Sequence, residues 1–174
     1  MLKGKAIHLR PIEIKDATLL LLWENNLHNW RYSETIAPFS LAEISAFIER
    51  ASDIHANKQL RMMICLNETD EAIGTIDFYA ISFKHMHAGI GILIASDEHR
   101  GKGYAKESLE LFIQYGREYL EIPNYFCSII KSNTDSVKLF EAAGFKHVGT
   151  RKNWYKNGKN QEDELLYQKE FNPL

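Results

Sequence analysis

Residues 87–116, HAGIGILIASDEHRGKGYAKESLELFIQYG, decide the fold. The apolar run at 87–95 predicts a buried strand, and the apolar residues between Tyr104 and Leu120 recur at helical spacing. Between them, Gly101 and Gly103 predict a tight loop, because glycine takes left-handed backbone angles at no steric cost. The stretch therefore predicts a strand, a glycine loop and a long helix in direct succession.

The loop at 100–105 has the properties of an anion site. A loop that opens a helix directs several unpaired main-chain N–H groups to one point, and the helix dipole adds positive potential there. Arg100, Lys102 and Lys106 add charge around it. A bare Gly-x-Gly is more often an ordinary strand-to-helix turn with solvated lysines, so both interpretations stay open at this point. The loop matches neither a Walker loop nor a dinucleotide fingerprint.

Further elements follow from periodicity and turn residues along the rest of the chain. Ser40 and Glu43 form a capping box for one of the helices. We expect strands at 6–10, 60–66, 72–81, 125–131, 146–155 and 163–171, the last two joined around Asn157 and Gly158, and helices at 16–27, 40–51 and 134–143. This order predicts an α/β fold in which one mixed sheet has helices on both faces, in a single domain spanning 1–174.

Composition narrows the class of protein. The chain has 174 residues, of which 45% are hydrophobic and 25% charged, which is typical of one globular domain. Its formal net charge of −2 gives no general attraction to nucleic acid or to a membrane. No segment resembles a signal peptide or a membrane span, so we expect a cytoplasmic protein. Cys65 and Cys127 lie in apolar runs and are expected to be buried free thiols.

A second motif lies about thirty residues after the loop. It consists of Asn133-x-x-Ser136, Leu139-Phe140-Glu141 and Gly144-Phe145. Taken alone, it predicts a short helix that Asn133 caps and that Gly144 ends.

Together the two motifs resemble the GNAT superfamily of N-acetyltransferases. Arg-x-x-Gly-x-Ala at 100–105 is similar to its pyrophosphate loop, and NxxSxxLFExxGF at 133–145 to its second cofactor motif. IHLRPIEIKDATLLLLWENN at 7–26 is similar to the branch that acetylates ribosomal proteins and spermidine or spermine. The resemblance covers nearly the whole chain. It implies a GNAT domain with a mixed, mostly antiparallel sheet, an acetyl-CoA-dependent enzyme without a metal, and a homodimer or larger oligomer.

The resemblance also implies a cofactor site. The strand before the loop would pair with the pantetheine arm of acetyl-CoA, and an N–H near Ile94 would hold the thioester carbonyl. The residues implied are Ile92, Leu93 and Ile94 along the arm, Arg100, Gly101, Lys102, Gly103, Tyr104 and Ala105 around the pyrophosphate, and Asn133 and Ser136 across from them.

The attacking amine must lose its proton, so a general base is expected. Glu34 and Asp77 are the candidates, and both could also bind a cationic acceptor. For Asp77 a structural hydrogen bond or ion pair is an equal alternative, and for Glu34 a solvated loop position is somewhat favoured. Trp30 and Tyr32 could line the acceptor groove, although burial in the core is commoner for aromatic residues.

Phe140 stands where many relatives have the tyrosine that protonates the departing thiolate. A phenyl ring cannot donate a proton, so water or another residue such as Tyr155 would have to do so. The vacancy also keeps a second hypothesis open, an acyl-CoA-binding sensor or scaffold with weak or lost catalysis. For the enzyme we expect a small cationic, polyamine-like amine as acceptor slightly more than a protein N-terminal amine. His85, His87 and His99 are expected at the surface and not around a metal.

Overall fold

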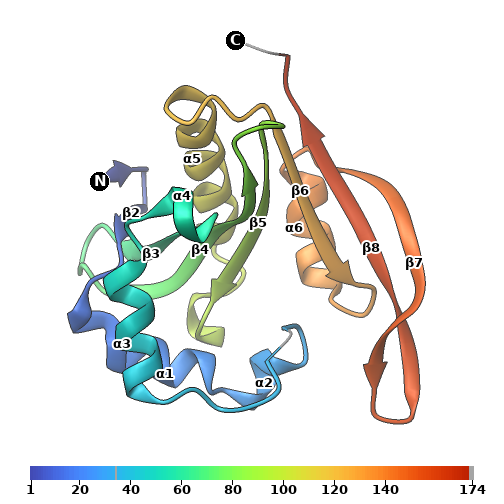
Figure 1. The fold of residues 1–174 in the computed structure, drawn as a ribbon, viewed down its shortest axis with the longest axis horizontal. Helices are drawn as coiled ribbons and strands as arrows, with labels where there is room; N and C mark the ends of the chain where they lie inside the picture. Colours follow the sequence, from blue (N-terminus) through green and yellow to red (C-terminus); the bar gives the residue numbers. More distant parts are fainter. Residues whose placement is uncertain (34, 173–174) are drawn as a thin grey trace.

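Eight strands form one sheet in the order β1-β2-β3-β4-β5-β6-β8-β7 (Figure 1). The computed structural model describes residues 1–33 and 35–172. The strands are β1 (Leu2–Lys3), β2 (Ile7–Pro11), β3 (Leu60–Leu66), β4 (Ala72–Ser82), β5 (His87–Ile94), β6 (Asn124–Ile130), β7 (Lys146–Asn157) and β8 (Asn160–Glu170). β5 and β6 are parallel, and the other neighbouring strands are antiparallel. The predicted class, a mixed and mostly antiparallel α/β sheet, is confirmed.

Helices cover both faces of the sheet. They are η1 (Ile14–Asp16), α1 (Ala17–Glu24), α2 (Leu27–Trp30), α3 (Leu41–Arg50), α4 (Ile54–Asn57), η2 (Asp97–His99), α5 (Tyr104–Glu118) and α6 (Thr134–Ala142). One core cluster joins the sheet to α5 and α6, and the other joins it to α1 and α3. None of the described helices is both long and apolar enough to cross a membrane.

Two helical regions differ from the prediction. The helix expected at 16–27 ends at Glu24, and α2 begins separately because the side chain of Asn26 accepts a hydrogen bond from the N–H of His28. A short helix, α4, that the sequence did not indicate begins where Asp53 caps the N–H of Ala56. In both cases an Asn or Asp side chain accepts a hydrogen bond from a main-chain N–H a few residues later, and this bond starts a new helix.

Other local predictions are confirmed. Ser40 and Glu43 form the reciprocal capping box at the start of α3. Cys65 and Cys127 are buried free thiols.

The long helix α5 packs on the sheet through an aromatic stack. Phe112 is fully buried, and its ring stacks on Phe78 of β4 with 3.9 Å between centroids. Phe78 in turn stacks on Tyr125 of β6. The stack therefore connects α5 to the strands on both sides of β5.

Phe112→Ala tests the importance of this stack. Deleting a fully buried phenyl ring should lower the free energy of unfolding by about 3–5 kcal/mol, because apolar contacts are lost and a cavity remains. Urea denaturation followed by circular dichroism measures the change. Gln114→Ala, at an exposed position of the same helix, should change stability by no more than about 0.5 kcal/mol. A loss of under about 1 kcal/mol for Phe112→Ala would contradict the prediction.

Candidate functional site

The two parallel strands at the centre of the sheet pair over only part of their length. The register runs from His87 opposite Asn124 to Gly89 opposite Phe126, although β5 continues to Ile94 and β6 to Ile130. Figure 1 shows the strands adjacent at one end and diverging towards the other. We call the unpaired part, residues 90–94 of β5 and 127–130 of β6, the split.

Main-chain groups of β5 are directed into the split. Ala95 donates its N–H to Ile73 of β4, and alternate residues of a strand direct their amides to opposite sides. Ile92 and Ile94 therefore direct theirs away from β4. The Ile94 carbonyl accepts a hydrogen bond of 3.1 Å from Nε of Arg100, whereas its N–H faces the split. Leu93, between them, packs against the core on the side of α1 and α3.

The glycine loop follows at the end of β5. Gly101 and Gly103 have φ of +72° and +86°, which favours glycine, and a Cβ at either would meet no atom within 4 Å. Gly103 is the N-cap of α5 and supplies no side-chain cap, so the first amides of α5, from Tyr104 and Ala105, have no acceptor from a capping side chain or from the preceding turn of helix. Lys102 is exposed beside them. The loop thus has the geometry of an anion site.

The guanidinium of Arg100 is already hydrogen-bonded within the protein and is not free to bind a phosphate. Besides the bond to Ile94, its guanidinium donates to Asp97 at 2.7 Å. It connects the end of β5 to η2 and so holds the loop in position.

The second motif lies at the same end of the parallel pair. Asn133 caps α6 by accepting from the N–H of Ser136, as the sequence indicated. Gly144 ends the helix with φ of +86°. Phe140 is buried in the core, where its ring lies edge-on to Phe145.

A groove of about 350 Å³ lies between α2 and the β7–β8 hairpin, and Ile130 at the end of β6 also lines it. Trp30 lines it, and its indole N–H donates to the carbonyl of Glu24. Tyr32 does not line this groove but lies edge-on to His28. The prediction for Glu34 lies outside the described residues. The lining residues are Leu27, Trp30, Arg31, Ser33, Ile130, Tyr155, Lys156, Gly158 and Glu162.

Asp77 belongs to a charged network that includes Glu24, whose main-chain carbonyl accepts the indole N–H of Trp30 in the groove. It is 8% exposed, and its Oδ1 accepts from Arg61 at 2.6 Å and from Gln59 at 3.0 Å. Arg61 also binds Glu24 of α1 and lies over the ring of Phe47. Burial alone would lower the pKa of Arg61, but Asp77 and Glu24 hold it above its ordinary value. The ion pair was the structural alternative that the sequence left open for Asp77.

Tyr79, which the sequence did not indicate as a site residue, lies where the split begins. Its ring covers Gly89, where a Cβ would meet the ring at 2.3 Å, and it also lies over Gly91. Burial raises the pKa of Tyr79 to about 12, while the main-chain N–H of Ser128 on β6 acts in the opposite direction. The hydroxyl is therefore protonated at neutral pH and lies beside the first unpaired residues of β6. Glycines within a strand can signal such a close approach.

A second missed residue is Glu164 of β8, which is 3% exposed. It accepts from Arg151 at 2.6 Å and from the hydroxyl of Tyr155 at 3.0 Å. Tyr155, which the sequence suggested as a proton donor, thus holds its hydroxyl on a buried carboxylate at the edge of the groove.

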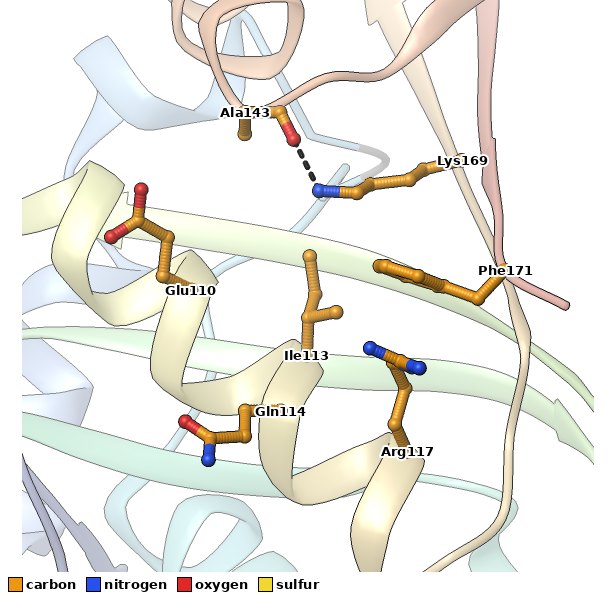
Figure 2. Close-up of a pocket in the computed structure, with 7 residues that line it drawn as sticks. All are labelled: Glu110, Ile113, Gln114, Arg117, Ala143, Lys169 and Phe171. Carbon is orange, nitrogen blue, oxygen red and sulfur yellow. Dashed lines mark hydrogen bonds between the residues drawn. The ribbon is translucent and has the colours of Figure 1, made fainter. Parts of the chain in front are cut away.

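A smaller hollow lies between α5 and α6 (Figure 2). In it, Lys169 donates to the carbonyl of Ala143, and Arg117 lies 4.0 Å from the ring centroid of Phe171. Burial lowers the pKa of Lys169. At about 160 Å³ the hollow is below the usual size of a small-molecule site, and we assign it no ligand.

The split offers unpaired main-chain groups of β5 to an extended ligand, and the uncapped start of α5 offers amides to an anionic group. Together they define a protein suited to an extended ligand that ends in an anionic group. A family profile for the acetyltransferase (GNAT) domain matches residues 6–146. The uncharacterized N-acetyltransferase p20 of Bacillus licheniformis is 30% identical over 150 residues, which are 85% of this chain and 83% of that protein.

Two spermidine acetyltransferases are also similar. Spermidine N(1)-acetyltransferase of Escherichia coli (strain K12) is 26% identical over 86% of this chain and 77% of its own length. The crystal structure of the Vibrio cholerae spermidine N-acetyltransferase with CoA and spermine superposes with a TM-score of 0.83, at 22% identity and over 94% of each chain. The chain belongs to the GNAT acetyltransferase family and is an acetyl-CoA-dependent N-acetyltransferase.

Gly103→Ala tests the glycine loop. A Cβ at φ +86° strains the backbone and projects into the open space before α5, so we expect CoA affinity to fall at least about tenfold in calorimetry. Gly144→Ala is the matched control, because Gly144 has the same φ and ends α6 instead of opening α5. Equal affinities in the two variants would contradict the assignment.

Proposed function

We propose that this acetyltransferase holds the diphosphate of CoA on the first amides of α5 and the pantetheine arm along the split side of β5. The support is the open space before Gly101 and Gly103, the uncapped start of α5, and the amides of Ile92 and Ile94 that lack a strand partner among the described residues. When bound, acetyl-CoA supplies an activated thioester. Asn133 and Ser136, at the start of α6, would flank the cofactor from the other side.

For the acceptor we propose a primary amine that enters through the groove between α2 and the β7–β8 hairpin. Arg31 and Lys156 are the cations of its described lining, and Glu162 is the carboxylate, which lies 3.8 Å from Arg31. The described lining thus carries a net positive charge, which repels a polyamine with several positive charges. A protein or peptide N-terminal amine, which carries one charge, is the better fit. The sequence favoured a polyamine because of Glu34 and Asp77, and Asp77 is paired with Arg61.

Chemistry requires a neutral amine at the moment of attack. An N-terminal α-amine with a pKa of about 8 is neutral in about one molecule in ten at pH 7, and an amine with a pKa of about 10.4 in only about one in 2,500. A proton acceptor or a water chain is therefore expected. Asp77 stays a prediction for this role. Its two assigned hydrogen bonds both fall on Oδ1, and the carboxylate is already stabilised by Arg61.

The departing thiolate also needs a proton, and Phe140 cannot donate one. Two tyrosine hydroxyls are candidates, that of Tyr79, which contacts the main chain of Ser128 in the split, and that of Tyr155, which lines the groove. Of the two we favour Tyr79, because it lies over β5 itself and is protonated at neutral pH.

Asp77→Asn distinguishes a base from a structural residue. If Asp77 accepts the proton of the amine, kcat/KM for the best acceptor falls at least about tenfold. If its role is only to pair with Arg61, the free energy of unfolding falls by about 1–3 kcal/mol while kcat/KM stays within about twofold. Steady-state kinetics and urea denaturation of the same preparation separate the two outcomes. An unchanged kcat/KM removes Asp77 from the mechanism.

An amine panel tests the acceptor class, with thiol release from acetyl-CoA as the measurement. We expect turnover of peptide N-termini to exceed that of spermidine. Lys156→Glu should raise kcat/KM for spermidine on the order of fivefold, because one repulsive charge becomes attractive at a solvated site.

Lys159→Glu is the control for this variant, since Lys159 is exposed in the same hairpin outside the groove lining. A preference of the unaltered enzyme for spermidine would contradict the proposed acceptor. CoA binding without turnover of any amine would instead support a sensor, which family membership does not favour.

A further inference from the structure

Three potential metal ligands meet on the neighbouring strands β2 and β3 and the turn after β3, away from the split. His8 of β2 and Cys65 of β3 are direct register partners, so their side chains share one face. Asp70 ends the β3–β4 turn with φ of +59°, which brings its carboxylate over the pair. Among the described residues these three form a group whose ligand atoms all lie within 4.8 Å of one another.

The hydrogen bonds around His8 determine which ring nitrogen carries a proton. The amide nitrogen of Asn67 donates to the carbonyls of Gly4 and Lys5, so its oxygen must face His8. That oxygen lies 3.1 Å from Nδ1 of His8, which therefore carries the proton and donates it. In the neutral ring this leaves Nε2 with a lone pair.

The lone pair on Nε2 faces another electron-rich atom. His8 is 5% exposed, and Nε2 has no hydrogen bond within the described part of the chain, yet it lies 3.1 Å from Oδ1 of Asp70. Two lone pairs at this distance repel each other unless a cation lies between them. That cation is either a second proton on His8 or a metal ion.

Cys65 favours the metal ion. A proton can bridge one nitrogen and one oxygen, but it gives no reason for a thiol to converge on the same point. Nitrogen, thiolate and carboxylate ligands together suit Zn²⁺, and three protein ligands leave a fourth position for water. The bond from His8 to Asn67 is the outer contact that commonly orients a metal-bound imidazole.

The surroundings are compatible with binding and release of an ion. Cysteine binds a metal ion as the thiolate, so a bound cation would replace the proton of the Cys65 thiol. The nearby Arg10 guanidinium is neutralised by Asp16 through bonds of 2.7 and 2.8 Å. The Asp70 side chain is 75% exposed and gives a path from solvent.

We propose that His8, Cys65 and Asp70 bind a divalent transition metal ion, Zn²⁺ by preference, in a structural site that joins the N-terminal residues to β3. β4 separates β3 from β5 in the sheet, so the site lies apart from the acetyl-transfer machinery. The sequence led us to expect no metal, because the histidines considered, His85, His87 and His99, offered no ligand set.

Cobalt titration of the tag-free, chelator-treated full chain tests the proposal. We expect one Co²⁺ per chain, with the visible bands of tetrahedral coordination and a thiolate-to-metal absorption in the near ultraviolet. Cys65→Ser should abolish the near-ultraviolet band. Cys127→Ser, which changes the other buried cysteine outside the group, should retain it.

Zinc affinity and thermal stability provide a second measurement. Excess Zn²⁺ should raise Tm by roughly 5–10 °C at about a hundred times its Kd. Asp70→Asn should weaken Zn²⁺ binding at least about tenfold, and asparagine tolerates the positive φ at this position. Acetyl transfer by Asp70→Asn should stay within about twofold of that of the unaltered enzyme.

Two results would overturn the proposal. One is the absence of stoichiometric Co²⁺ or Zn²⁺ binding by the chelator-treated chain. The other is a near-ultraviolet band that persists in Cys65→Ser.

Discussion

The site depends on one constraint, which is that β5 and β6 stop pairing after three residues. Each strand remains paired on its other side, β5 with β4 as far as Ile94 and β6 with β8 over its whole length. The sheet therefore opens along a single line while both halves keep their hydrogen bonds. Unpaired amides in the middle of a sheet are costly unless a ligand or water satisfies them, which supports the proposal that the cofactor binds at this opening.

Tyr79 illustrates how the opening is built. Its ring needs the space that Gly89 leaves free, and its hydroxyl reaches the main-chain N–H of Ser128, within the unpaired part of β6. The glycines of β5 thus serve two purposes. They let the ring lie flat on the strand, and they let the hydroxyl project where the strands part.

Features governed by neighbouring residues could be predicted from the sequence. The caps at Ser40 and Asn133, the helix end at Gly144 and the glycine loop all follow from side chains within a few positions of one another. The class of fold and the family followed from two such motifs at a fixed separation. The break between α1 and α2 and the short helix α4 were missed at this level, because Asn26 and Asp53 were not recognised as caps.

Contacts across strands could not be predicted, because they depend on register. Asp77 meets Arg61, and His8 meets Cys65, only through the alignment of β3 with its two neighbours. Glu164 meets Arg151 in the same way, across the β7–β8 hairpin. A shift of one residue would place each of these side chains on the opposite face of the sheet, and no local pattern specifies the alignment.

The three register pairs between β5 and β6 also have a mechanical consequence. Little strand pairing resists a rotation that widens or narrows the opening, whereas the shared aromatic stack of Phe78, Phe112 and Tyr125 beneath it resists a complete separation. The sheet can therefore flex along the line between β5 and β6, and the apolar aromatic stack acts as the pivot of this motion. Thermal motion of the two halves about this stack would change the width of the opening in which we propose that the two substrates meet.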